Sequence, residues 1–331
     1  MSRPYSVDHS VFVRDLWPGG IGKLQGNTEH DHLAPLWTTI TPSFDALCTF
    51  ITVDPLEVPY SDPARRHVVR YQPELEAPTE TFSIKVQGFL KDFHMDPLGN
   101  WGGKENTAFK ATRSIVLDSG GCDGPFNMQK DVLNMIKEVI VHSLDHAVLD
   151  VPVDSRPGIH LRSNVFTQIR SNSPVVSSSI HARDDPRGFA AKIARRWAVT
   201  STIKMRAPAT TGARLLPATR VQFRSGDFVE VKVVPDIVTT FQNRHLRVDV
   251  RFIPISITRL CTAAEAKARA NITLASHLLP QSSSPIQPST SQSVTATTTA
   301  TPQEWQQMIR DSYFPPVPPP SAVDRAENGL I

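Results

Sequence analysis

Apolar and polar residues alternate most regularly between Arg220 and Leu260, where Val, Ile and Phe exchange places with Arg, Lys and other polar residues. A period of two is typical of antiparallel strands that bury one face. Residues 79–93 and 107–118 alternate in the same way, and a loop of turn-forming residues separates them, so we expect two antiparallel strands joined by a long loop. The residues expected on their buried faces are Phe82, Ile84, Val86, Leu90, Phe109, Ala111, Ile115 and Leu117.

Residues 126–149 follow a helical period instead. Their apolar residues fall within about 60° of one another on a helical wheel, which is typical of a helix that packs on a core. They are Leu133, Ile136, Ile140, Leu144 and Ala147. A second, basic helix is expected at 184–197, with Asp185 as its cap and Pro186 at its first position. A continuous strand from Ala190 to Arg206 is the alternative, because the residues after Arg196 also alternate.

These patterns predict an α+β fold, in which an antiparallel β-sheet or small barrel packs against one long amphipathic helix. The chain has 331 residues, of which 40% are hydrophobic, so it can bury a sizeable core. We place the globular domain at residues 35–270, with a possible subdivision near 150–180. Residues 1–34 are rich in glycine and lack a sustained period, and are expected to form a loosely ordered N-terminal arm.

The composition changes after the domain. Residues 271–300 are expected to hold the end of a helix and a disordered tether, because 12 of the 22 residues from Gln281 to Pro302 are Ser or Thr. Residues 301–331 predict a short amphipathic helix and a proline-rich tail. One side of that helix carries Trp305, Met308, Ile309 and Tyr313. So short a helix is unstable alone, so this side either docks on its own domain or binds a partner protein.

Several classes of protein are not expected. The N-terminus lacks the pattern of a signal peptide, and no segment approaches the length of a membrane span, so we expect an intracellular protein, nuclear or cytoplasmic, with no membrane partner. The three cysteines, Cys48, Cys122 and Cys261, are widely spaced, which indicates neither a disulfide framework nor a zinc site. No glycine-rich fingerprint of a dinucleotide or phosphate loop is present, so no cofactor is expected.

Charge separates one region from the rest. Between His181 and Leu260 there are 15 Lys and Arg against 6 Asp and Glu, in a chain whose net charge is only +3. A local basic excess concentrates ligands that carry phosphate. The candidate phosphate contacts are Arg195, Arg196, Lys204, Arg220, Arg224, Arg247 and Arg251. With aromatic residues among them, they predict a non-enzymatic binding protein, for which nucleic acid is the first partner to test.

A hydrolase is the alternative. The residues IVLDSGG at 115–121 resemble the catalytic loop of aspartic peptidases of the single-domain retroviral type. That resemblance implies that Asp118 supplies one carboxylate of a dyad completed by a second subunit, and the paired carboxylates would activate a water. The same residues also fit a strand that ends in an Asp-Ser-Gly-Gly turn.

His142 and His146 have the i, i+4 spacing that can hold a zinc ion on one face of a helix. On the helical wheel they lie opposite the apolar stripe, beside acidic residues, so a solvated face is expected and not a metal site.

Overall fold

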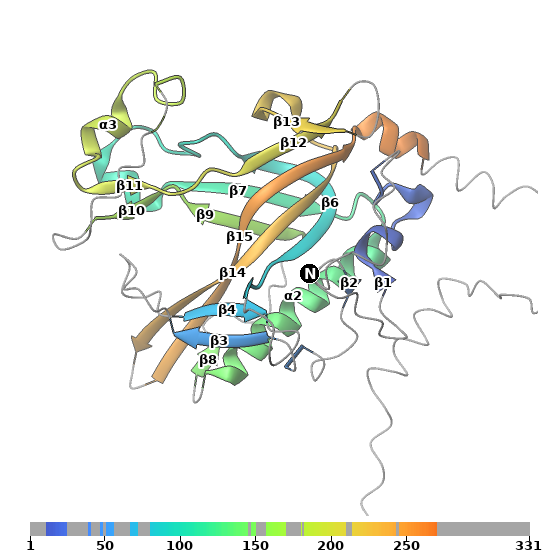
Figure 1. The fold of residues 1–331 in the computed structure, drawn as a ribbon, viewed down its shortest axis with the longest axis horizontal. Helices are drawn as coiled ribbons and strands as arrows, with labels where there is room; N and C mark the ends of the chain where they lie inside the picture. Colours follow the sequence, from blue (N-terminus) through green and yellow to red (C-terminus); the bar gives the residue numbers. More distant parts are fainter. Residues whose placement is uncertain are drawn as a thin grey trace, which may run out of the picture. The chain divides into compact units, whose positions relative to one another are not determined.

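The alternating segment near the end of the predicted domain forms two long strands that pair along their whole length, β14 (Phe228–Gln242) and β15 (His245–Cys261). They are the centre of the main sheet of an α+β fold (Figure 1). The computed structural model describes residues 11–24, 39–40, 47–48, 51–55, 67–71, 80–144, 147–149, 157–169, 180, 182–209, 214–242 and 245–269. Contacts divide the chain into two units, 1–279 and 280–331, and the second lies wholly outside the described residues.

Seven strands of the main sheet follow the order β13-β12-β15-β14-β6-β7-β9, and β8 pairs with β15 beside this path. Neighbours are antiparallel except at β12 and β8, which run parallel to β15. The remaining bounds are β6 (Ile84–His94), β7 (Thr112–Asp118), β8 (Ala147–Leu149), β9 (Ile159–Asn164), β12 (Lys204–Pro208) and β13 (Leu215–Pro217). The sheet curls until β9 approaches β15, but no ladder joins them, so the expected small barrel does not close among the described strands.

Three smaller sheets accompany it. Their strands are β1 (Val11–Phe12) with β2 (Thr39–Ile40), β3 (Ile51–Pro55) with β4 (His67–Tyr71) and β5 (Glu80–Thr81), and β10 (Phe166–Gln168) with β11 (Trp197–Val199). No helix in the described part of the chain is long and apolar enough to cross a membrane.

The long helix is α2 (Asp123–Ser143), which contacts β3, β6, β8 and β15. The predicted stripe is buried where the helix exists, at Leu133, Ile136 and Ile140. The predicted end at 149 is wrong, because the helix stops at Ser143 and residues 147–149 pair with β15 instead. As a strand, the apolar residues 147–149 form hydrogen bonds with β15, and a further turn of helix would leave that edge of β15 without this partner.

Part of the expected N-terminal arm belongs to the core. Two 3-10 turns, η1 (Val13–Asp15) and η2 (Pro18–Gly20), carry Trp17, which is 3% exposed. The Trp17 ring meets Phe228 edge-on at 4.7 Å and Phe89 at 6.2 Å between ring centroids. Aromatic pairs in this geometry add to the free energy gained from burial. This segment therefore differs from the loose arm that its glycines suggested.

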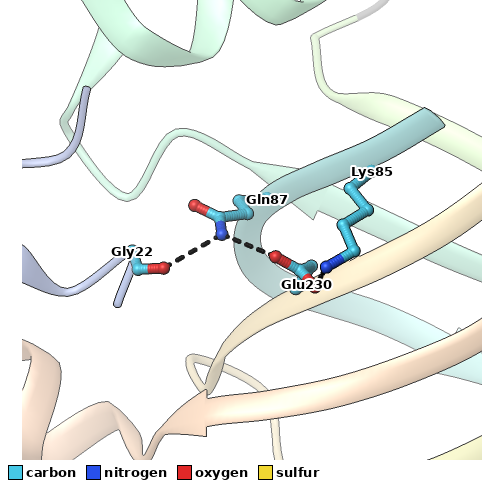
Figure 2. Close-up of polar contacts among 4 residues, drawn as sticks. All are labelled: Gly22, Lys85, Gln87 and Glu230. Atoms are coloured by element: carbon cyan, nitrogen blue, oxygen red, sulfur yellow. Dashed lines mark hydrogen bonds and ion pairs between the residues drawn. The ribbon is translucent and has the colours of Figure 1, made fainter. Parts of the chain in front are cut away.

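A buried amide secures the same segment (Figure 2). The Gln87 Nε2 atom donates to the Gly22 carbonyl at 3.1 Å and to the Glu230 carboxylate at 3.0 Å. Glu230 in turn lies 3.0 Å from the ammonium of Lys85. The main chain of Gln87 also exchanges hydrogen bonds with the Gln129 side chain of α2, which joins the helix to β6. The network thus ties the N-terminal segment to β6 and β14.

A second hydrophobic cluster lies apart from the main core and forms what we call the α3 lobe, residues 98–111, 165–169 and 182–199. Its elements are η5 (Glu105–Lys110), α3 (Phe189–Ile193), β10 and β11, seen at one end of the main sheet in Figure 1. Between the alternatives for 190–206, the structure has the helix first and then strands. The predicted start is wrong, because the N-cap residue is Gly188 and the helix begins at Phe189 and not at Pro186, although the Asp185 carboxylate accepts N–H groups of the first turn.

The side chain of Arg113 joins the lobe to β7. It is fully buried, and its guanidinium donates to the carbonyls of Pro97, Thr200 and Ser201 and to the Thr200 hydroxyl, at 2.6 to 3.2 Å. Burial lowers the pKa of Arg113 to about 10, so the group stays charged at neutral pH. All of these acceptors are neutral, so hydrogen bonds rather than an ion pair offset the cost of burying the charge.

Replacing Arg113 with Lys should lower the free energy of unfolding by about 2–4 kcal/mol. An ammonium cannot reach both the Pro97 carbonyl and the carbonyls of Thr200 and Ser201, so buried carbonyls are left without a donor. Urea unfolding followed by circular dichroism measures the change. Arg162→Lys, on the exposed side of the neighbouring strand β9, is the matched control and should change stability by less than about 0.5 kcal/mol. Equal effects of the two substitutions would contradict this role for Arg113.

Candidate nucleic-acid interface

The structure separates the seven predicted phosphate contacts into three regions. They are Arg195 and Arg196 in the α3 lobe, Lys204, Arg220 and Arg224 around β12 and η6 (Arg220–Gln222), and Arg247 and Arg251 in the first half of β15. Ser256, the partner of Lys204 on β15, lies nine residues beyond Arg247. At about 3.3 Å per residue these positions are about 30 Å apart along the strand. The seven residues are therefore not one patch.

Several of these cations already have partners. Arg196 lies 3.1 Å from Glu105, and Arg251 pairs with Asp249 on its own strand. Arg220 lies 3.3 Å from Asp96 and stacks over the Phe93 ring at 5.7 Å from its centroid. An arginine that is already paired must exchange a carboxylate for a phosphate, so it gains less from binding nucleic acid than an unpaired one.

The α3 lobe carries the densest surplus of positive charge. Its cations outnumber its acids by seven to three. Every one of these acids is engaged within the lobe: Glu105 by Arg196, Asp184 by Arg183 at 3.6 Å, and Asp185 by three main-chain N–H groups at the start of α3. Five cations have no carboxylate partner among the described residues, namely Lys104, Lys110, Arg187, Lys192 and Arg195.

Aromatic rings lie among these cations. Phe109 is 57% exposed, and the Lys110 ammonium lies 5.3 Å from the centroid of its ring. Phe189 is half-buried, with the Lys192 ammonium at 5.2 Å and the Arg187 guanidinium at 6.0 Å from its ring centroid. Exposed rings beside cations can stack on bases while the cations neutralise phosphates. The prediction that Phe109 belongs to the buried face is wrong, because η5 turns this ring outward before β7 begins.

The lobe holds the Phe189 ring in a fixed place. Gly103 has a φ of +85°, and a Cβ atom at this position would lie 2.3 Å from the ring. Trp101 packs edge-on against Phe166 at 4.6 Å, and its indole N–H donates to the Lys104 carbonyl. The loop before η5 is therefore a packed part of the lobe, although its turn-forming residues suggest only a connection.

Sequence reasoning identified only part of this surface. Arg195 and Arg196 were candidates, but Lys104, Lys110 and Phe109 were not, because they lie outside the basic segment and only the packing of the second hydrophobic cluster brings them beside it. The sequence of 107–118 contains one signal for the exposure of Phe109. Phe109 lies near the start of the alternating segment, and it is the one large apolar residue there that has a lysine, Lys110, beside it. Three phenylalanines of the basic region, Phe223, Phe228 and Phe252, are buried as their alternation indicated.

Asp118 makes local turn contacts. It ends β7, and its carboxylate accepts the N–H of Gly120 at 3.1 Å, while the Ser119 hydroxyl accepts that of Gly121 at 3.3 Å. Gly120 and Gly121 both have positive φ, and a Cβ on Gly120 would meet the Phe89 ring at 2.2 Å. These contacts are those of an Asp-Ser-Gly-Gly turn that leads into α2. They account for the residues of the peptidase-like segment, and the dyad across two subunits stays a prediction.

Of the two histidines with the zinc spacing, the structure describes only His142. α2 ends at Ser143, one residue after His142, and His146 lies outside the described residues. The described part of the chain contains no group of three metal-binding side chains. The predicted partner-binding residues Trp305, Met308, Ile309 and Tyr313, the tether and the proline-rich tail all lie outside the described residues.

Gly103→Ala should displace the Phe189 ring and destabilise the lobe by about 1–3 kcal/mol, because the new methyl group overlaps the ring and φ is positive. Hydrogen exchange measured by mass spectrometry should show faster exchange in peptides from 98–111 and 189–199. Gly102→Ala is the matched control, since nothing lies within 4 Å of its Cβ position. Unchanged exchange in Gly103→Ala would contradict the packing of Gly103 on Phe189.

No family model matches this chain, and no curated protein sequence matches it. Among solved structures, this chain is similar to three structures of the single-stranded DNA-binding protein from bacteriophage Enc34. A C-terminal truncation has 11% identity and a TM-score of 0.25, with 63% of this chain and 94% of that chain covered. The complex with single-stranded DNA has 13% identity and a TM-score of 0.27, with 55% of this chain and 87% of that chain covered. A third structure has 9% identity and a TM-score of 0.23, with 63% of this chain and 90% of that chain covered. At such low TM-scores and identities, the likeness carries no argument about this chain's function.

Proposed function

We propose that this protein binds single-stranded nucleic acid through the α3 lobe. The observation that carries the proposal is the exposed Phe109 ring and the cation-flanked Phe189 ring on a lobe whose acids are all engaged internally. Stacking on an exposed ring needs an unpaired base, which favours a single strand over a duplex.

The cations would have distinct roles. Lys192 and Arg195 lack carboxylate partners in the described part of the chain, so they can contact phosphates without first breaking an ion pair. Arg196 would act through Glu105 on η5, which keeps the two halves of the surface together. Contacts of this type position the strand without reading its sequence. Stacking is likewise tolerant of the base, so we expect weak sequence preference.

The double substitution Lys192→Glu and Arg195→Glu should weaken binding to labelled oligo-dT by about tenfold or more at low salt. It should also reduce the slope of log K against log salt by about 1.4, since each lost phosphate contact on a single strand contributes about 0.7. Fluorescence anisotropy of the full-length protein across a salt series measures both quantities.

The matched control for this pair is Arg162→Glu with Lys267→Glu, which changes the charge equally at exposed positions outside the lobe. An equal loss in control and test variants would mean that net charge alone matters, and would contradict the lobe as the site. Absence of binding by the unmodified protein at low salt would remove the proposed function.

Phe109→Ala should weaken binding to single-stranded DNA by about 1–3 kcal/mol, the cost of losing one stacked base. It should leave binding to heparin unchanged, because heparin offers charge without bases to stack. The ring is largely exposed, so thermal stability should not change. Val221→Ala, at another exposed apolar residue, is the control, and equal losses for DNA and heparin would contradict a stacking role.

A further inference from the structure

Strand register places three lysines in one row across the main sheet. Lys204 of β12 is opposite Ser256 of β15, Ser256 is opposite Lys232 of β14, and Lys232 is opposite Lys85 of β6. Residues directly opposite in a ladder point to the same face of a sheet. These three lysines come from distant parts of the chain, and only the pairing of the four strands brings them together.

The row lies on the face of the sheet opposite an adjacent row of apolar residues. One position along, the ladder joins Met205, Ile257, Val231 and Val86, of which the last three are buried and Met205 packs against them. Because side chains alternate between faces, the lysines point away from this apolar layer. Lys204 is exposed, and Lys232 and Lys85 are half-exposed.

The next row on this face adds one arginine and one carboxylate. The neighbouring row on the same face brings Arg206 of β12, Thr258, Glu230 and Gln87 together. Glu230 is its one acid, and it is held by the ammonium of Lys85 at 3.0 Å and the amide of Gln87, as Figure 2 shows. The two rows thus present four cations against one carboxylate. Lys204 and Arg206 are exposed, so these two cations of β12 can reach a phosphate from solvent.

We propose that the three lysines and the arginine of the neighbouring row form a second phosphate-binding region for the strand held by the α3 lobe. We call these four residues the lysine row: Lys204, Lys232, Lys85 and Arg206. This rests on the proposed function of the lobe. Lys204 begins β12 only four residues after Thr200, which Arg113 binds and which follows β11 of the lobe. Four residues span at most about 14 Å, so the row starts where the lobe ends.

The other end of the row is closed by the N-terminal segment. Gly22 accepts the Gln87 hydrogen bond beside Glu230, and Trp17 covers Phe89 and Phe228 on the same face. A strand that leaves the lobe therefore crosses β12, β15 and β14 and stops at β6. The lobe and the row together require a longer strand than the lobe alone.

Oligonucleotide length provides the test. In the full-length protein, Lys204→Glu with Lys232→Glu should leave the affinity for an oligo-dT of about 6 nucleotides unchanged, since so short a strand fills the lobe only. The same variant should weaken binding of an oligo-dT of about 20 nucleotides by about tenfold and reduce its salt slope by about 1.4. The neutral pair Lys204→Gln and Lys232→Gln, which fits the strands without charge reversal, should reduce the slope equally.

The lobe variant Lys192→Glu with Arg195→Glu, measured beside it, separates the two proposals. If the lobe variant weakens both lengths and neither row variant weakens the longer one, the lysine row is wrong and the lobe site stands. If the row variants weaken both lengths and the lobe variant weakens neither, the lobe site is wrong, and with it the path from lobe to row. Equal loss in the Arg162→Glu with Lys267→Glu control would overturn the row as a specific site.

Discussion

The buried guanidinium of Arg113 is the interaction on which the arrangement of the α3 lobe depends. It is held by carbonyls from the loop before η5 and from the segment after β11, so one side chain of β7 fixes both ends of the lobe. No carboxylate is among the acceptors that it binds, so the positive charge is satisfied by dipoles and not cancelled. Arginine has five N–H groups in a planar fork, more donors than any other side chain, so one guanidinium can serve all of these acceptors.

Rigidity at this junction matters for the surface above it. Rings and cations bind a strand well only if they are already in place, because ordering them during binding costs free energy. The Phe189 ring rests on Gly103, Glu105 pairs with Arg196, and the Asp185 carboxylate accepts three main-chain N–H groups at the start of α3. The proposed binding groups are thus attached to packed elements and not to free loops.

Local patterns predicted what depends on neighbours in sequence. The alternation in β6, β7 and β14 and the apolar stripe of α2 identified buried residues such as Val86, Ile115 and Ile136. They failed where tertiary contacts decide, as in the end of α2, the packing of Trp17 and the outward turn of Phe109. The positions of the cations also depend partly on local sequence and partly on tertiary contacts. A count along the chain found the basic region, but no count could place Lys85 beside Lys232, since strand register creates that proximity.

The pairing of β6 with β14 also bears on how the chain folds. It joins residues 84–89 to residues 228–233, and Trp17 packs against Phe228 at the edge of the same ladder. Contacts between segments so distant in sequence form slowly, because a long loop must close before they yield any stabilisation. During synthesis, β6 has no partner on this side until β14 leaves the ribosome. For most of translation, β6 therefore has an edge of unpaired N–H and C=O groups, which can pair with a strand of another chain and cause aggregation.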